Sequence, residues 1–226
     1  RLPLKNPDDP TSVDREQVKI MVDRFLENGF TYFDTAWMYH SFKSEEVLRE
    51  ALVNRHSRNS FTVATKMPVM MINSKEEQKQ VFEKQTEKTG ADYFDYYLLH
   101  CLNEANYERA VRYETFEFLS KLKKEGRIRR LGFSYHDKPE LLDRILSEHP
   151  ETEFVQLQIN YLDWESESVC SRENYEVCVK HAKPVIVMEP VKGGTLVNLS
   201  EGVANIFKNA APSMSLASWA IRFAAS

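Results

Sequence analysis

Apolar residues recur along this chain at two alternating spacings, one typical of helices and one typical of buried strands. Near the N-terminus, Val18, Met21, Val22 and Phe25 stand three or four positions apart, which predicts an amphipathic helix. A short aromatic and β-branched run at residues 30–36 follows, and it predicts a buried strand. The same alternation continues to the C-terminus.

The periodicity predicts the elements of the whole chain. The predicted strands are residues 30–36, 61–66, 94–100, 128–134, 154–159 and 185–189. The predicted helices are residues 14–28, 44–54, 75–88, 108–125, 139–148, 173–181, 201–209 and 215–224. Strands that alternate with helices in this way predict βαβ units and a parallel sheet with right-handed crossovers.

Two architectures fit this alternation, an open doubly wound sheet and a closed barrel. A dinucleotide-binding open sheet carries GxGxxG after a strand, and none of these strands is followed by that run. A closed barrel needs eight strands and about 250 residues. This chain has 226 residues, six predicted strands, and a helix at each end. We therefore expect an α/β fold of the (β/α)8 TIM-barrel type that lacks the first and last strands, as a single domain over residues 1–226.

Composition and charge narrow the class of partner. The chain has 30 Lys and Arg against 34 Asp and Glu, so its formal charge of −4 does not attract nucleic acid or an anionic membrane. No apolar stretch approaches the ~20 residues of a membrane span, and the first ten residues lack the apolar core of a signal peptide. Three cysteines without a CxxC pair suit a reducing compartment. These features predict a cytoplasmic protein with a small-molecule substrate and with neither nucleic acid nor membrane as partner.

Three successive predicted strands end on an ionisable side chain: Asp34, Lys66 and His100. In a parallel barrel these ends share the face where active sites are found. Buried charges need partners, and Asp34 and Lys66 can neutralise each other. Tyr39 follows on the same face, where a neighbouring ammonium group favours the phenolate form and makes Tyr39 a candidate general acid. Each residue alone is more often an ordinary strand end or a structural ion pair, but together they predict a site.

Five segments carry a recognisable pattern, in chain order: Phe33-Asp34-Thr35-Ala36-x-x-Tyr39, Ser44-Glu45-x-x-Leu48, Val63-Ala64-Thr65-Lys66, Asp95-Tyr96-Tyr97-Leu98-Leu99-His100 and Ile128-Arg129-x-Leu131-Gly132-Phe133-Ser134. Together they resemble the successive signatures of the aldo-keto reductases, and the resemblance runs from about residue 14 to the C-terminus. It implies a TIM-type barrel that binds NADP(H), or NAD(H), and reduces an aldehyde or ketone to an alcohol by hydride transfer.

Carried over residue by residue, the resemblance implies four catalytic residues. Tyr39 matches the proton donor, Lys66 and Asp34 match the pair that tunes it, and His100 matches the residue that orients or polarises the substrate carbonyl. Hydride delivery builds negative charge on the carbonyl oxygen, so the site needs donors aimed at that oxygen and a proton to complete the alcohol.

The resemblance also implies a set of cofactor-binding residues. Ser134 and Gln156 match positions that hydrogen-bond the nicotinamide carboxamide, which a hydroxyl and an amide suit. Glu189, Lys192 and Gly194 belong to a segment that resembles the pyrophosphate loop, where glycines admit phosphate to the backbone and lysine supplies charge. The alternatives are a polar strand residue that faces a loop, for Gln156, and a plain Gly-Gly turn.

Two departures from the family pattern concern the nicotinamide ring. Glu189 stands where many members have a stacking aromatic residue, and Tyr135 stands where many have Asn. The segment from Met188 to Gly194 and the strand ending at His100 also resemble a subgroup with a C-terminal ferredoxin-like iron–sulfur tail. No CxxCxxCxxxC run occurs in this sequence, so we expect no metal centre.

Two other functions stay open at this point. One is a nucleotide-binding or regulatory relative with little turnover, because the eighth strand and its helix, which usually grip the adenosine, are absent from the sequence. The other is a Schiff-base enzyme with Lys66 as nucleophile, which is disfavoured because Asp34 would keep that amine protonated.

Two missing strands predict two open sheet edges, each a row of unpaired backbone N–H and C=O groups. We therefore expect weak stability or self-association through these edges unless a second chain or further strands cover them. Size-exclusion chromatography with light scattering, together with a thermal melt, checks this expectation. A sharp monomer peak with a cooperative melt contradicts it.

Overall fold

The computed structural model describes residues 2–226 and contains two compact units. The first unit runs to Ser134 and includes Glu151–Glu153, and the second contains residues 135–150 and 154–226. Each unit has its own buried apolar core. Whether residues 1–226 behave as a single domain stays a prediction.

Parallel strands with helices between them build the first unit. Its elements are, in chain order, α1 (Arg15–Glu27), β1 (Tyr32–Asp34), α2 (Tyr39–Phe42), α3 (Ser44–Leu48), β2 (Thr62–Met67), α4 (Lys75–Thr89), β3 (Phe94–Leu102), α5 (Glu104–Arg112), α6 (Thr115–Lys124) and β4 (Ile128–Tyr135). Strand order follows the chain. Strand β2 pairs in parallel with β1, where Phe33 lies opposite Val63, and with β3, where Lys66 lies opposite Leu98.

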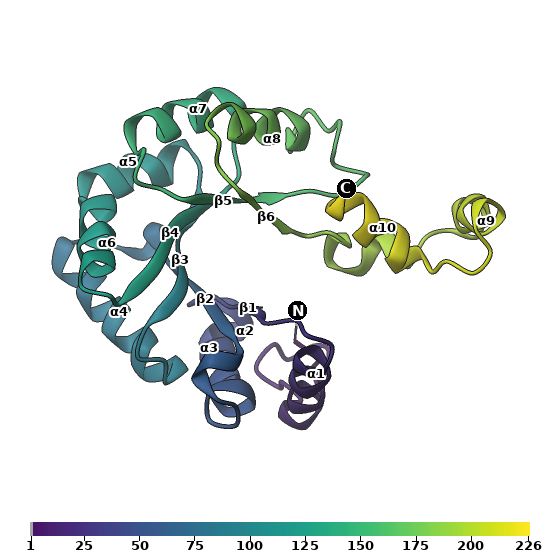
Figure 1. The fold of residues 1–226 in the computed structure, drawn as a ribbon, viewed down its shortest axis with the longest axis horizontal. Coiled ribbons are helices and arrows are strands. Elements are labelled where there is room, and N and C mark those ends of the chain that lie inside the picture. The colour runs from purple at the N-terminus through teal and green to yellow at the C-terminus, as the bar shows by residue number, and fades with distance from the viewer. Residues whose placement is uncertain (1) are drawn as a thin grey trace. The chain divides into compact units, whose positions relative to one another are not determined.

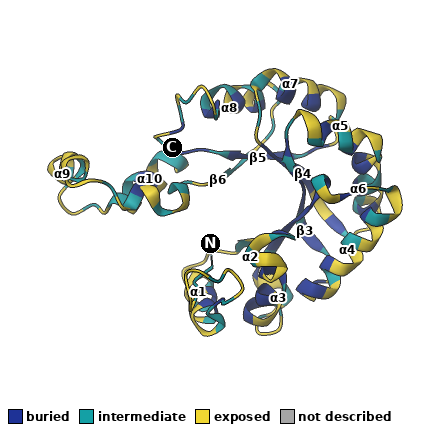
Figure 2. Cartoon of the chain, turned by 180° about the vertical axis from the view of Figure 1, so that it is seen from behind, coloured by how far each residue is buried: buried dark blue, intermediate teal, exposed yellow. Residues whose placement is uncertain are grey.

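Strand β3 lies at the centre of the first unit's core. Phe94, Tyr97, Leu98 and Leu99 are fully buried on it, because a parallel strand covered on both faces is apolar along nearly its whole length. Helices α3, α4 and α6 lie together on one face of these strands (Figure 1). Buried residues accordingly concentrate on the strands and on the helix faces turned towards them (Figure 2).

The second unit repeats the alternation over a shorter length. Its elements are α7 (Pro139–Glu148), β5 (Phe154–Gln158), α8 (Ser171–Lys180), β6 (Val185–Met188), α9 (Glu201–Ala210) and α10 (Leu216–Ala225), with a 3-10 turn at Lys192–Val197. Strands β5 and β6 pair in parallel, with Val155 opposite Val185. All four residues of β6 are only half-buried.

The predicted fold class is confirmed. All six predicted strands occur within two residues of their expected ends, and helices alternate with them. The pairs β1–β2, β2–β3 and β5–β6 are parallel. Helix α7 spans the predicted residues 139–148, and it begins with Pro139, which suits the first helical position.

The single helix predicted at residues 108–125 was wrong, because the segment forms two helices. Helix α5 begins at Glu104, where the Asn103 side chain caps it by accepting from the Asn106 amide at 2.9 Å. The break before α6 falls at Glu114, a non-glycine residue with φ of 54°. Similarly, the helix predicted at 44–54 is α3 followed by a π-helical turn at Arg49–Val53.

The buried residues of α4 explain why its apolar pattern in the sequence is weak. Its buried face contains Phe82 but also the polar side chains Gln78, Gln85, Lys88 and Thr89. A helix that packs through polar groups carries a weak apolar stripe, and those buried groups require partners inside the unit.

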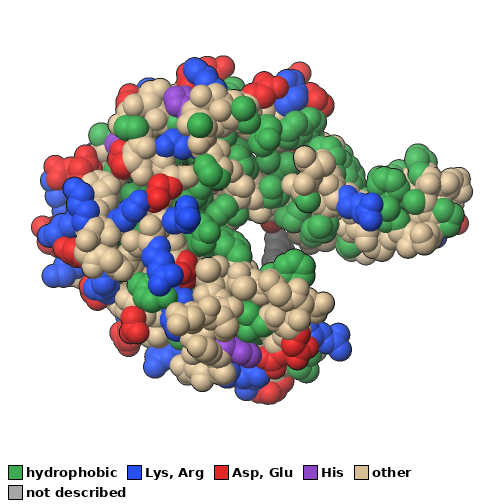
Figure 3. All heavy atoms as spheres, in the orientation of Figure 1, with side chains coloured by type: hydrophobic (Ala, Val, Ile, Leu, Met, Phe, Trp, Pro, Cys, Tyr) green, Lys and Arg blue, Asp and Glu red, His purple; other side chains and the backbone are tan. Residues whose placement is uncertain are grey.

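The surface differs between the units. Lys and Arg side chains intersperse with Asp and Glu over α4 and α6, whereas apolar side chains such as Val203 and Ile206 are exposed on α9 (Figure 3). Among residues 2–226 no helix combines the length and apolarity that crossing a membrane requires.

Phe82 is the aromatic anchor that α4 contributes to the core. Its ring centroid lies 5.7 Å from that of Phe94 and 5.3 Å from that of Tyr97. We expect Phe82→Ala to lower the free energy of unfolding by about 3–5 kcal/mol through lost burial and a cavity, and Phe82→Leu to lower it by about 1–2 kcal/mol. Urea denaturation followed by circular dichroism measures both changes.

The control for this prediction is Val111→Ala, because Val111 is an exposed apolar residue on α5. Its effect should stay within about 0.5 kcal/mol. Equal losses for Phe82→Ala and Val111→Ala would contradict the packing of α4.

Candidate active site

Asp34, Tyr39, Lys66 and His100 lie together in the first unit. Asp34 ends β1, Lys66 and His100 lie near the ends of β2 and β3, and Tyr39 begins α2. Lys66 is only 1% exposed, and its ammonium group forms an ion pair with the Asp34 carboxylate. It also donates to the Thr35 carbonyl oxygen at 2.9 Å. The buried cation is therefore neutralised as the sequence predicted.

Tyr39 covers this ion pair. The Lys66 Nζ atom lies 5.0 Å from the centroid of the Tyr39 ring, a cation–π arrangement. The His100 ring meets the Tyr39 ring edge-on, with centroids 5.7 Å apart. Tyr39 is 38% exposed whereas Lys66 and His100 are buried, so the cluster is open to a ligand on the tyrosine side.

Tyr32 is a further member of the cluster that the sequence reasoning missed. Its hydroxyl donates to Asp34 Oδ2 at 3.3 Å. Burial, together with the neighbouring Asp34 carboxylate, raises the pKa of the Tyr32 phenol well above its usual range, so this hydroxyl remains a donor at neutral pH. Residues two apart on a strand point to the same face, and that spacing was the available signal.

The segment that presents Tyr39 has an unusual backbone. His40, Ser41 and Phe42 all adopt positive φ, at 50°, 50° and 69°. Non-glycine residues disfavour this left-handed region because Cβ approaches the carbonyl oxygen. Contacts to the segment must therefore hold it, and one is the His40 ring nitrogen, which accepts from the Leu2 amide at 3.0 Å.

Ser134 is the one predicted cofactor residue that lies in the first unit. It is buried on β4, and its Oγ accepts a hydrogen bond from the Cys101 amide at 2.8 Å. Cys101 follows His100 and has φ of 59°, so this bond fixes a kink in β3 beside the cluster. Because Ser134 acts here as acceptor, its hydroxyl proton can be donated elsewhere.

The other predicted cofactor residues lie in the second unit. Gln156 is buried on β5, and Glu189 directly follows β6 with φ of 56°. The Asn160 amide donates to the Glu189 carbonyl oxygen at 3.1 Å. Gly194 has φ of 98°, which glycine adopts without strain. This bond and these backbone angles shape the turn that carries Lys192.

Asp163 holds Lys192 in place, a contact that the sequence reasoning also missed. The Lys192 ammonium lies 2.5 Å from Asp163 Oδ1, and the Gln158 and Asn160 amides both donate to Asp163 Oδ2 at 2.7 Å. Burial opposes ionisation of Asp163, but the bonds from Lys192, Gln158 and Asn160 outweigh it, so the pKa of Asp163 is lowered. An Asx turn at Asn160, whose side-chain oxygen accepts from the Leu162 amide at 3.1 Å, was the local signal.

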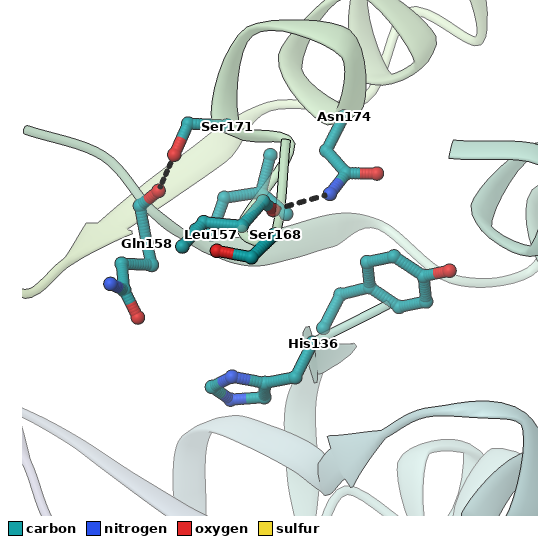
Figure 4. Close-up of a pocket in the computed structure, with 8 residues that line it drawn as sticks. His136, Leu157, Gln158, Ser168, Ser171 and Asn174 are labelled. Carbon is teal, nitrogen blue, oxygen red and sulfur yellow. Dashed lines mark hydrogen bonds between the residues drawn. The ribbon is translucent and has the colours of Figure 1, made fainter. Parts of the chain in front are cut away.

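A cavity of about 220 Å³ also lies in the second unit (Figure 4). His136, Gln158, Ser168 and Asn174 are among its lining residues. The Ser171 hydroxyl donates to the Gln158 carbonyl oxygen at 2.7 Å and closes one wall. None of the nine predicted site residues lines this cavity.

Nearly the whole chain matches one protein family. The model of the Aldo/keto reductase family matches residues 4–225. This chain belongs to the aldo/keto reductase family. The family resemblance read from the sequence motifs is therefore confirmed.

One curated relative is the uncharacterized oxidoreductase YqkF of Bacillus subtilis (strain 168). It is 32% identical over 124 residues, which is 50% of this chain and 38% of that protein. The match thus spans well under half the length of the relative.

Solved aldo-keto reductases share the fold. An enzyme of Klebsiella pneumoniae, in complex with NADP and acetate, has a TM-score of 0.71 at 24% identity over 90% of this chain and 69% of that chain. The holo form of an enzyme of Bacillus halodurans has a TM-score of 0.73 at 24% identity over 92% of this chain and 72% of that chain. These likenesses show the TIM-barrel type of fold.

The lowered pKa of Asp163 predicts a pH-dependent contribution to stability. The native state stabilises the ionised form of Asp163 more than the unfolded chain does, so the contribution of this carboxylate to the free energy of unfolding is complete at neutral pH. It is lost as pH falls from the usual aspartate range through the lowered native pKa. We expect Asp163→Asn to lower the free energy of unfolding by about 1–2 kcal/mol at pH 7, less than for a fully buried pair because Lys192 reaches solvent.

Urea denaturation at pH 7 and at about pH 3 tests this contribution. The difference between the wild type and Asp163→Asn should shrink at the lower pH. Asp8→Asn, at an exposed residue of the first unit, serves as the control and should leave both midpoints unchanged. A difference that is the same at both pH values would contradict the role of the carboxylate charge.

Proposed function

We propose that this protein is an NADP(H)-dependent oxidoreductase that reduces an aldehyde or ketone to an alcohol, with Tyr39 as proton donor. The observation that carries the proposal is the Tyr39 ring, which lies against the buried Lys66 ammonium and the His100 ring and is exposed to a ligand. Two Klebsiella pneumoniae structures of the family are complexes with NADP and NADPH, and the Bacillus subtilis relative is named an oxidoreductase.

The charges of the cluster suit proton donation by Tyr39. When Tyr39 gives its proton to a substrate oxygen, negative charge appears on the phenol, and the fixed Lys66 ammonium favours that charge. The Asp34 carboxylate holds Lys66 in place. This pairing also disfavours a Schiff-base role for Lys66, because a nitrogen engaged as the donor of a buried ion pair is not available as a nucleophile. The buried His100 ring orients the carbonyl oxygen beside Tyr39.

In each unit, taken separately, the residues present fit part of a nicotinamide dinucleotide. A bound NADPH supplies the hydride that reaches the carbonyl carbon. The Ser134 hydroxyl has a proton to donate to a carboxamide oxygen, and Gln156 offers both a donor and an acceptor. In the turn after β6, Gly193 and Gly194 adopt positive φ beside Lys192, so no Cβ atom stands on this backbone and the lysine supplies positive charge next to it.

The central prediction concerns the Tyr39 hydroxyl. We expect Tyr39→Phe to lower kcat by about 100- to 10,000-fold, because general acid catalysis is lost, while the Kd for NADPH changes by less than about twofold. NADPH absorbance with a panel of aldehydes and ketones measures turnover, and a cofactor fluorescence titration measures binding.

The control variant is Tyr175→Phe, at an exposed tyrosine on α8 in the second unit, which should retain wild-type turnover. Equal loss of turnover and cofactor binding in Tyr39→Phe would overturn the assigned role. Tight cofactor binding by a wild type that turns over no carbonyl compound would favour the regulatory alternative.

A further inference from the structure

A buried polar network lies behind Lys66, and the proposed reaction does not use it. Glu45 on α3 and Gln85 on α4 are fully buried, and Lys88 on α4 is 8% exposed. A buried charge is costly unless it is paired, so a carboxylate and an ammonium at this depth call for a structural reason.

One arm of the network reaches the strand that carries Lys66. The Gln85 amide donates to the Lys66 carbonyl oxygen at 3.0 Å and to Glu45 Oε1 at 2.8 Å. The Thr65 hydroxyl also donates to Glu45 Oε1 at 2.8 Å. The Tyr97 hydroxyl donates to Gln85 Oε1 and fixes the orientation of that side-chain amide. Glu45 is thereby tied to the backbone of Lys66.

The other arm reaches the segment that carries Tyr39. The Lys88 ammonium lies 3.1 Å from Glu45 Oε2 and donates to the Phe42 carbonyl oxygen at 2.7 Å. It also lies 4.7 Å from the centroid of the Trp37 ring. Trp37 and Phe42 flank Tyr39, and their rings contact each other edge-on with centroids 6.2 Å apart.

This segment needs such support because of its backbone. His40, Ser41 and Phe42 are three consecutive non-glycine residues in the left-handed region. Such a segment relaxes to ordinary angles unless surrounding contacts over-determine it. Lys88 provides two of those contacts, one at each end of the stretch that presents Tyr39.

We propose that Lys88 is a positioning residue that holds Trp37 and Phe42 and so fixes the Tyr39 ring over the Lys66 ammonium. Glu45 orients Lys88, and through Gln85 the same carboxylate holds the Lys66 backbone, so both halves of the Tyr39–Lys66 pair share one anchor. The expected effect on turnover rests on the proposed reductase function.

The first test is turnover by Lys88→Met. We expect kcat to fall about 10- to 100-fold, because small misplacement of a reacting group costs this much, with the Kd for NADPH changed by less than about twofold. Lys88→Arg should keep kcat within about threefold of the wild-type value, because a guanidinium can reach Glu45, Phe42 and Trp37 together. Lys84→Met removes an exposed lysine of the same helix, paired with Glu87, and should change nothing.

Lys88→Met leaves Glu45 buried without its ion-pair partner, and this alone can destabilise the fold. The double variant Glu45→Gln/Lys88→Met removes that charge, and it should fold and yet stay slow because the contacts to Trp37 and Phe42 are still missing. Wild-type turnover in the folded double variant would overturn the proposal.

The second test reads the position of Tyr39 without turnover. With 3-fluorotyrosine at position 39, the ¹⁹F spectrum should show one sharp resonance for the wild type, Lys84→Met and Lys88→Arg. It should broaden or split in Lys88→Met as the ring samples several positions. An unchanged resonance in Lys88→Met overturns the proposal, even if kcat falls. If the wild type reduces no carbonyl compound, the proposed function fails, and the fluorine spectrum alone decides the role of Lys88.

Discussion

The buried ammonium group of Lys66 is the constraint on which the first unit depends. An isolated charge in an apolar interior is strongly unfavourable, so the fold must bring a carboxylate and further acceptors to it. Strand register does this: Asp34 lies opposite Ala64, two residues before Lys66, and the Lys66 side chain spans that offset to reach the carboxylate. The Thr35 carbonyl oxygen supplies the second acceptor. The burial of the Lys66 charge therefore depends on the observed register between β1 and β2.

The same constraint extends outward into the helices. The backbone carbonyl of Lys66 faces α4, where the side-chain amide of Gln85 donates a hydrogen bond to it. An apolar side chain at position 85 would leave this carbonyl oxygen unsatisfied. Gln85 in turn needs acceptors and donors of its own, which Glu45 and Tyr97 provide. Each buried polar group thus needs a hydrogen-bond partner that is itself buried and polar. The network ends at Lys88, which reaches the Phe42 carbonyl oxygen and solvent. The weak amphipathicity of α4 results from these buried polar residues, which interrupt the apolar face of the helix.

Local pattern was enough to predict the strands and the ionisable residues at their ends. An apolar run that stops at Asp34, Lys66 or His100 is visible in the sequence, and parallel topology alone places such ends on one face. The break at Glu114 was not predictable in this way, because the helical pattern continues across it and a left-handed non-glycine residue has no strong local signature. The Asn103 cap did carry a signal.

Contacts between residues far apart in the sequence could not be predicted from local patterns. Gln85 meets Glu45 across 40 positions, Lys88 meets Phe42 across 46, and Lys192 meets Asp163 across 29. Spacing along one element cannot reveal a partner on another element, since side-chain direction and register decide the meeting. A buried polar residue on a helix face shows that a partner exists without showing which one it is.

Each of the two units fixes one of the predicted site lysines with the same arrangement of contacts. Lys66 is held by Asp34, whose second oxygen accepts from Tyr32, and Lys192 is held by Asp163, whose second oxygen accepts from two amides. The neutral donors hold each carboxylate in place, and the carboxylate holds each ammonium in one place. Immobilising a lysine side chain costs up to about 2 kcal/mol of rotamer entropy. Because folding has already fixed both side chains, no rotamer entropy is lost at either lysine when a neighbouring group becomes negatively charged, and this is the condition for electrostatic preorganisation.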